Sequence, residues 1–287
     1  MSTTQPADRD AARAIGLNPQ ERRNGSSEVV ERALDVLLSF LDTEGELGVS
    51  EIARRLDMDK GRVHRFLTAF KRKGLIAANA RTHRYSLGFR VLELSVALSR
   101  QFDVVAQAQP FLHELQGATS ETAGLAALVG DHRVHLAQVE SEHDIRQSFP
   151  IGKPLPIYAG AVGKVLLAFL PAEEMERLLA KPLEPLGPAT IVDRDQLQRE
   201  LIQVRQQGYA VSLGERVADS RSIAAPVWSW RGDVMAVNLS GPASRFTAEK
   251  ALAASGLIRD AASRLTRQLG GEPFARAVSE WQVASSK

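Results

Sequence analysis

The 287-residue sequence contains no cysteine. Disulfide scaffolds, Cys-based zinc sites, iron–sulfur clusters and thiol catalysis are therefore excluded, and a reducing compartment is expected. No segment reaches the roughly 18 uninterrupted apolar residues of a membrane-spanning helix, and residues 1–24 lack the apolar core of a signal peptide. We therefore expect a cytoplasmic protein without membrane contact, folded into about two domains for a chain of this length.

Net charge is also small, because 36 Lys and Arg residues stand against 34 Asp and Glu residues. The charges are unevenly distributed. Residues 54–90 hold eleven basic and two acidic side chains, a local charge of +9. A block of this kind is typical of a solvated face or of a surface that binds a polyanion, and the hydrophobic pattern must decide between the two.

Apolar residues at helical spacing begin near Ser27 and predict a helix with one buried stripe, formed by Val30, Ala33, Leu34, Leu37, Leu38 and Leu41. Two short helices are expected next, with Ser50 and Asp59 as their N-caps. The small Ala53 allows close helix packing, Asp57 tolerates a left-handed turn, and Gly74 ends the second helix. This order predicts a helix-turn-helix.

A small hairpin, or wing, is expected from Leu75–Ala77 and Tyr85–Leu87 on either side of a polar turn. The apolar side chains of the second short helix fall on one face and its bases on the other. A helix whose outer face is merely exposed to solvent would carry acidic as well as basic side chains on that face. The separation of apolar from basic side chains therefore favours DNA binding.

Beyond the wing, an uninterrupted apolar stripe predicts a linker helix over residues 89–102, followed by a helix over 103–117. Strands are expected at 123–129, 134–139, 145–149, 223–228 and 234–239, and helices at 160–169, 172–180, 194–207 and 247–269. The fold class is α+β, with helices on a central sheet. The expected organisation is a flexible arm (1–25), a winged helix-turn-helix (26–88), the linker helix (89–102), an effector-binding domain (103–271) and a C-terminal tail (272–287).

Five segments, in this order, carry a resemblance to a known family. They read LGVSEIARRLDMDKGRVHRFL (47–67), RYSLGFRVLELS (84–95), IGKPLPIYAGAVGKVLLA (151–168), RSIAAPV (221–227) and LSGPASRFT (239–247). The sequence resembles the IclR-type family of bacterial transcriptional regulators from about residue 26 to 271. The resemblance implies a dimer or tetramer that binds a palindromic double-stranded operator and responds to a small-molecule effector, such as an organic or aromatic acid of a catabolic pathway.

The resemblance also implies which residues act. Candidates for DNA binding are Lys60, Gly61, Arg62, His64, Arg65, Arg81 and Arg84. Arg62 is the candidate for reading the edge of a nucleobase. Most of the other basic side chains are assigned to phosphate contacts. Candidates for the effector pocket are Leu155, Gly160, Ala161, Val162, Ser212, Ser222, Asn238 and Ser240. Ser222 stands where many members have Cys.

The glycines at 160 and 163 open a helix, whose free N–H groups suit a carboxylate. This is not a phosphate-binding loop, because Lys164 precedes Val165 rather than Ser or Thr. Three charged residues between the candidate positions 212 and 222 are interpreted as surface charges: Glu215, Arg216 and Arg221. Phe149, Trp228 and Trp230 either stack on an aromatic ligand or pack in the core.

Two alternatives stay open. An enzyme would use a metal site around His132, His135 and His143 with Asp131 and Glu140, or Ser220 or Ser222 as a nucleophile. Strand alternation argues against the metal site by placing His132 and His135 on opposite faces, and a Gly-x-Ser-x-Gly elbow is missing. An effector-free architectural DNA protein is disfavoured because residues 103–287 carry a net charge of −2. We expect no cofactor and no metal.

Overall fold

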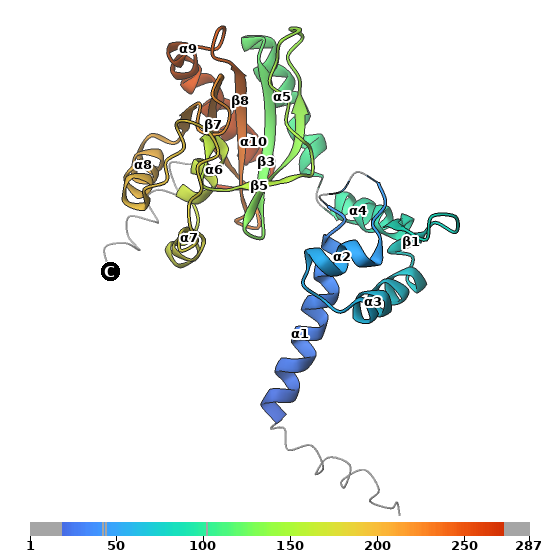
Figure 1. Cartoon of the computed structure of the whole chain (residues 1–287). Helices are drawn as coiled ribbons and strands as arrows, with labels where there is room; N and C mark the ends of the chain where they lie inside the picture. Colours follow the sequence, from blue (N-terminus) through green and yellow to red (C-terminus); the bar gives the residue numbers. More distant parts are fainter. Residues whose placement is uncertain (1–18, 42, 44, 102, 273–287) are drawn as a thin grey trace, which may run out of the picture. The chain divides into compact units, whose positions relative to one another are not determined.

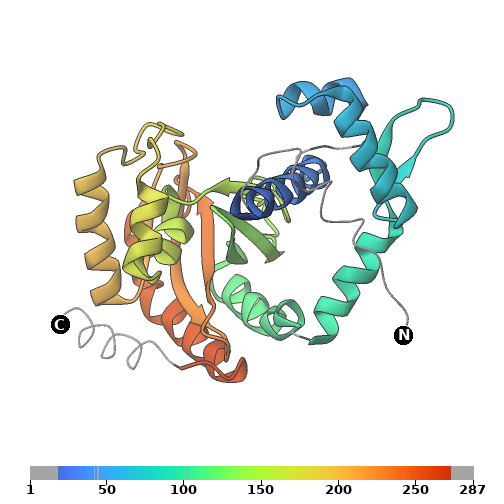
Figure 2. The same cartoon turned by 90° about the horizontal axis from the view of Figure 1, so that it is seen from below.

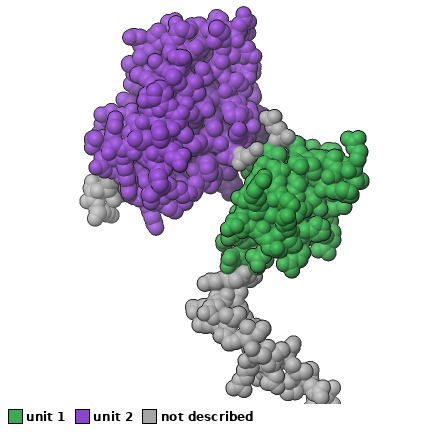
Figure 3. Space-filling model, viewed as in Figure 1, with its two compact units in different colours: residues 1–97 green, residues 98–287 purple. Residues whose placement is uncertain are grey.

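The computed structural model describes residues 19–41, 43, 45–101 and 103–272. The chain divides into two compact units, residues 1–97 and 98–287 (Figure 3). The division falls inside one helix, α4, and each unit is described by itself. The predicted arm lies outside the described residues up to position 18, as do the end of the predicted linker helix, Phe102, and the tail from residue 273.

Unit 1 is a small helical module with a two-stranded hairpin (Figure 1). Its elements are α1 (Pro19–Leu38), α2 (Val49–Arg55), α3 (Lys60–Arg72), β1 (Ile76–Ala78), β2 (Tyr85–Leu87) and α4 (Phe89–Gln101). The core between α1, α2, α3 and the hairpin consists of Val36, Phe40, Leu47, Ile52, Ala53, Val63, Leu67 and Ile76. The helix-turn-helix and the wing are therefore present as predicted.

Local signals between α2 and α3 act as the sequence indicated. Asp57 adopts the left-handed conformation with φ +46°. The side chain of Asp59 caps α3 by accepting a 2.9 Å hydrogen bond from the N–H of Arg62. The prediction for Ser50 was wrong, because α2 begins at Val49 with Gly48 as its N-cap. Leu47 pairs with Tyr85 through two backbone hydrogen bonds, so the extended segment ends there and the helix follows at once.

The predicted stripe of the first helix was right only for Leu37, which packs against the core, and for the half-buried Ala33. The buried side of α1 and its following turn consists of Val36 and Phe40. The exposed side chains are Val29, Val30, Leu34, Leu38 and Leu41. Moreover α1 begins at Pro19 rather than near Ser27, consistent with the preference of proline for the first position of a helix. The unit therefore leaves an apolar helix face in contact with solvent.

Unit 2 is built on a six-stranded antiparallel sheet with the order β5-β4-β3-β8-β7-β6. The strands are β3 (Thr122–Val129), β4 (His132–Val139), β5 (Pro154–Pro156), β6 (Ala210–Leu213), β7 (Ser220–Trp228) and β8 (Val234–Pro242).

Helices pack on both faces of this sheet (Figure 2). One layer holds α5 (Val104–Thr119), α9 (Ala248–Ala253) and α10 (Ser255–Gln268), which enclose the larger core with the odd-numbered side chains of β3 and β7. The other layer holds α6 (Gly160–Ala168), α7 (Ala172–Leu179) and α8 (Arg194–Gln207). The α+β class with a central sheet is thus confirmed.

Three expectations for unit 2 need correction. Residues 145–149 form no strand, because their backbone is held by side chains, including Thr122 Oγ1 on Gln147 O and Gln138 Oε1 on Phe149 N. The edge strands β5 and β6 were not predicted. Pro154 and Pro156 do not donate ladder hydrogen bonds, so β5 is confined to an edge. The predicted helix 247–269 is two helices that meet at Ala254.

Candidate DNA-binding surface and ligand cavity

The N-terminal half of α3 presents an exposed basic face, here called the recognition surface. It consists of Lys60, Gly61, Arg62, His64 and Arg65, all of them exposed. The opposite face of the same helix packs Val63 and Leu67 into the core. The side chains of Lys60, Arg62 and Arg65 form no hydrogen bond or ion pair with the residues that the structure describes. Three cations within the first two turns of the helix are therefore available to an external partner.

Glycine at position 61 has a local cause. A Cβ there would lie 3.0 Å from Oδ1 of Asp59, the atom that caps the helix. A larger residue at this position would crowd the cap. The first turn of α3 therefore carries no side chain at position 61, directly beside Arg62.

The turn of the wing is shaped by one carboxylate. Glu46 accepts hydrogen bonds from Asn79 Nδ2 (2.6 Å) and Thr82 Oγ1 (2.7 Å), while Asn79 Oδ1 accepts from the N–H groups of Arg81 and Thr82. These bonds, that from Asn79 first, hold the pKa of Glu46 below its usual range. Arg81 is left exposed at the tip of the wing, with no side-chain partner among the described residues.

Arg84 has a role that its sequence pattern did not indicate. Its Nε and Nη2 donate to the carbonyl oxygen of Glu46 (3.2 and 2.7 Å), and Nη2 also contacts the carboxylate of Glu51 at 3.0 Å. Glu51 in turn pairs with Arg55 of the same helix, α2. Arg84 therefore ties the wing to the helix-turn-helix, and Arg81 is the freer cation of the two.

A narrow cavity lies in unit 2 between the α6 side of the sheet and the start of α6. Ser212, Ser222 and Ser240 face one another across β6, β7 and β8, since the register pairs Ser212 with Ser222 and Ser222 with Ser240. The cavity is lined by seven of the eight predicted effector residues: Gly160, Ala161, Val162, Ser212, Ser222, Asn238 and Ser240. Its volume of about 30 Å³ corresponds to about two water molecules.

The eighth predicted residue, Leu155, does not line the cavity. It lies on β5 at the edge of the sheet, directly opposite Arg133 of β4. Phe149, considered from sequence as a candidate to stack on a ligand, also lines the cavity. The sequence reasoning did not place the other lining residues in this cavity: Arg133, His135, Glu215, Arg216, Val217 and Ser220. The signal for Arg133 and His135 was their alternate spacing in a strand, but burial of these polar residues is visible only in the fold.

Arg133 brings an uncommon feature to the cavity, a buried guanidinium. Its side chain is 4% exposed, and its Nε donates to the carbonyl oxygen of Pro156 at 3.0 Å. Burial first, and then the positive charge of Arg216, lower the pKa of Arg133 to about 9, while Glu215 opposes the change. Arg133 forms no ion pair with a described residue. Because a buried charge is costly unless paired, the site favours an anion.

Glu215 was interpreted as a surface charge, and this was wrong. Its carboxylate is 5% exposed and accepts a 2.8 Å hydrogen bond from the N–H of Gly160 at the start of α6. The other oxygen contacts Nζ of Lys164 at 2.7 Å. Lys164, 2% exposed, also donates to Glu200 and to the carbonyl oxygen of Val211. The helix terminus expected to receive a ligand carboxylate thus binds one supplied by the protein.

The remaining wall of the cavity is aromatic and polar. The ring of Phe149 stacks on the imidazole of His135, with centroids 4.1 Å apart and planes at 3°. Space for this stack comes from Gly124 on β3, where a Cβ would lie 2.8 Å from Oδ1 of Asn238 and 3.1 Å from the Phe149 ring. Of the three aromatic residues considered from sequence, Phe149 alone lines the cavity.

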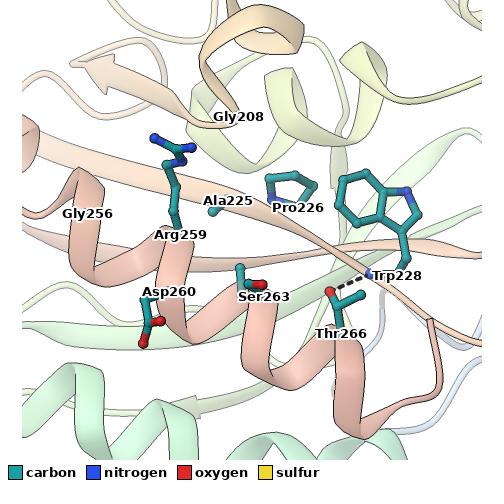
Figure 4. A pocket seen from close by; sticks show the side chains of 10 residues that line it. Gly208, Ala225, Pro226, Trp228, Gly256, Arg259, Asp260, Ser263 and Thr266 are labelled. Atoms are coloured by element: carbon teal, nitrogen blue, oxygen red, sulfur yellow. Dashed lines mark hydrogen bonds between the residues drawn. The ribbon is translucent and has the colours of Figure 1, made fainter. Parts of the chain in front are cut away.

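A second hollow lies beside α10 (Figure 4). Trp228 and Pro226 of β7 form its apolar side, and the N–H of Trp228 donates to Thr266 Oγ1 of α10 at 3.2 Å. Arg259 and Asp260 of α10 border the same hollow and are exposed. Trp228 also packs edge-on against Phe169, as a core residue would. Trp230 is exposed and lies at the turn between β7 and β8.

The features of the enzyme alternative do not come together. Among the described residues, no group of three His, Asp or Glu side chains is placed to hold a metal ion. His135 is buried in the cavity, whereas Asp131 pairs with Arg177 and Lys181. Ser220 contacts another hydroxyl, that of Ser240, at 3.3 Å.

No described helix is long and apolar enough to cross a membrane.

The fold combines a helix-turn-helix module with an α+β domain that holds a cavity, and comparison with known proteins identifies the family with this arrangement. The IclR helix-turn-helix domain model matches residues 29–80, and the model of the C-terminal domain of bacterial transcriptional regulator IclR matches residues 96–267. The chain belongs to the IclR family of bacterial transcriptional regulators.

Individual relatives are regulators rather than enzymes. The chain is 33% identical over 260 residues to the HTH-type transcriptional regulator BhcR of Paracoccus denitrificans, covering 90% of this chain and 92% of that one. It is 32% identical over 236 residues to the regulator KdgR of Escherichia coli, covering 82% and 90%. The crystal structure of an IclR transcriptional regulator from Alicyclobacillus acidocaldarius matches with a TM-score of 0.71 at 26% identity, over 84% and 98% of the two chains.

Proposed function

We propose that this protein is a cytoplasmic transcriptional regulator that binds a two-fold operator as a homodimer or homotetramer. The recognition surface enters the major groove, where Arg62 reads a guanine edge and Lys60, Arg65 and, from the wing, Arg81 bind phosphates. His64 and Gly61 lie against the DNA backbone. The observation that carries this assignment is the set of exposed, unpaired cations on a helix whose other face is core.

Apolar surface on two helices supports the oligomer. Besides the exposed side of α1, the helix α4 exposes Phe89 (87% exposed), Leu92, Leu94 and Val96. Contiguous apolar faces of this kind mark interaction sites in soluble proteins. A second copy of the chain covers them in the proposed dimer, and its two-fold symmetry matches a palindromic operator.

The proposed effector is a small organic acid bound in the cavity. Support comes from the buried, unpaired charge of Arg133, which an effector carboxylate would neutralise, assisted by Arg216 in the same cavity. Effector binding is linked to the operator through α4, which runs without a break across the division between the units.

Specific reading by Arg62 is tested by Arg62→Ala. Loss of a bidentate contact to guanine costs about 1–3 kcal/mol per half-site on operator DNA, with little change on random DNA. The measurement is fluorescence anisotropy with the DNA upstream of the protein's own gene and with a scrambled duplex of equal length. Arg65→Ala, the matched control, weakens both duplexes alike. Equal losses of affinity for the two duplexes in Arg62→Ala would show that Arg62 does not read a base.

A further inference from the structure

Two polar side chains of the cavity are buried without partners. His135 is 0% exposed and Asn238 is 1% exposed. Both ring nitrogens of His135, and both Nδ2 and Oδ1 of Asn238, form no hydrogen bond with the residues that the structure describes. Leaving such buried groups unpaired is costly. Four unpaired atoms in one cavity therefore point to a ligand that pairs with them.

The chemistry of these atoms defines what the ligand must offer. Burial, followed by the charges of Arg133 and Arg216, lowers the pKa of His135 to about 3, so its imidazole is neutral in the cell. A neutral imidazole has one N–H donor and one nitrogen acceptor, and the amide of Asn238 has two donors and one acceptor. The site therefore holds unmatched acceptors as well as donors.

A direct hydrogen bond between His135 and Asn238 would not satisfy all of their donors and acceptors. Asn238 opposes the lowering of the His135 pKa as a hydrogen-bond partner of the ring would, yet the distances and angles between the two side chains do not meet hydrogen-bond criteria. If His135 donated to Asn238 Oδ1, the other ring nitrogen would still need a donor. If Asn238 donated to His135, its own Oδ1 would still need one. In every arrangement the ligand must donate a proton here.

We propose that His135 and Asn238 form a subsite for a hydroxyl group, so that the effector is a small hydroxy acid. This inference rests on the proposed function, in which Arg133 binds the carboxylate. Arg133 and His135 alternate along β4 and line the same cavity, so one ligand reaches both. A keto oxygen accepts but does not donate, and an alkyl carbon does neither. A hydroxyl does both.

Matched acids test the subsite in the full-length protein. Isothermal titration calorimetry compares glycolate with acetate, and lactate with propionate and pyruvate. We expect the hydroxy acid of the better-fitting size to bind at least about tenfold more tightly than its partners without a hydroxyl, since an unmatched buried group remains with those. Equal affinity within both sets would overturn the proposal and would indicate that water pairs with His135 and Asn238.

Two variants locate the effect. Asn238→Ala and His135→Phe, the second of which keeps an aromatic ring for Phe149 to stack on, should reduce the preference for the hydroxyl to about threefold or less while propionate or acetate still binds. A preference retained in both variants would contradict the proposal. Arg133→Gln should abolish binding of all five acids. If no acid binds the unaltered protein, the proposed acid effector itself is wrong. Thermal unfolding of each variant verifies the fold.

Discussion

Replacing Lys164 by Met is expected to lower the free energy of unfolding of unit 2 by about 3–5 kcal/mol, the cost of removing one partner from a buried ion pair. All three Nζ donors of Lys164 are used, by Glu200, Glu215 and the carbonyl oxygen of Val211. Without the ammonium group, the carboxylate of Glu215 stays buried with only the N–H of Gly160 as a partner. Urea unfolding followed by circular dichroism measures the loss.

Glu200 provides a matched control, because its side chain is 37% exposed and contacts the same ammonium group. Glu200→Gln should cost about 1 kcal/mol or less, as expected of an exposed pair. Adding Glu215→Gln to Lys164→Met should recover part of the stability, since the amide oxygen still accepts from Gly160 and no charge is left unpaired. Equal losses for Lys164→Met and Glu200→Gln would show that burial of the pair does not matter.

Operator affinity is expected to fall about 10³-fold between 50 and 200 mM salt. In the proposed dimer, Lys60, Arg65 and Arg81 of the two protomers would neutralise about six phosphates, which corresponds to a slope near −5 in a plot of log affinity against log salt. Because each released counterion contributes about 0.9 to the slope, Lys60→Gln should make it shallower by about 2 in a dimer. Anisotropy titrations at four salt concentrations give both values.

Arg199→Gln is the control for this slope, since it removes the same charge from an exposed position of α8 in unit 2. We expect the slope to stay unchanged in that variant. A slope near zero for the unaltered protein, or equal changes for Lys60→Gln and Arg199→Gln, would contradict phosphate binding by the recognition surface.

The DNA-binding module could be predicted from sequence because its signals are local. Asp59 caps the helix that follows it, Asp57 takes the turn, and the apolar and basic positions of α3 separate at helical spacing. The first helix could not be read in this way. Leu34 and Leu38 repeat with the same spacing as a buried face, but they lie on the exposed side, where a partner rather than the unit's own core can cover them.

The sequence predicted the serine and asparagine residues and the helix start that line the cavity, but it did not predict the cavity's buried charged residues. Register across β6, β7 and β8 brings Ser212, Ser222 and Ser240 together, and the family motifs located these residues. Sequence spacing does not indicate that Arg133 and Glu215 are buried, because strand alternation distinguishes two faces but not which face a later helix will cover. The helix start at Gly160 was expected to receive the carboxylate of a ligand, but Glu215 of the protein itself binds there.

The link between the cavity and the operator is tested most directly by one titration. Operator affinity is measured by anisotropy for the full-length protein, with and without a saturating concentration of the acid that binds most tightly in calorimetry, and the same is done for Arg133→Gln. We predict at least a fivefold change in the operator Kd of the unaltered protein. Arg133→Gln should bind the operator equally well without acid and show no response. An operator Kd that stays constant while the acid is bound would contradict the linkage.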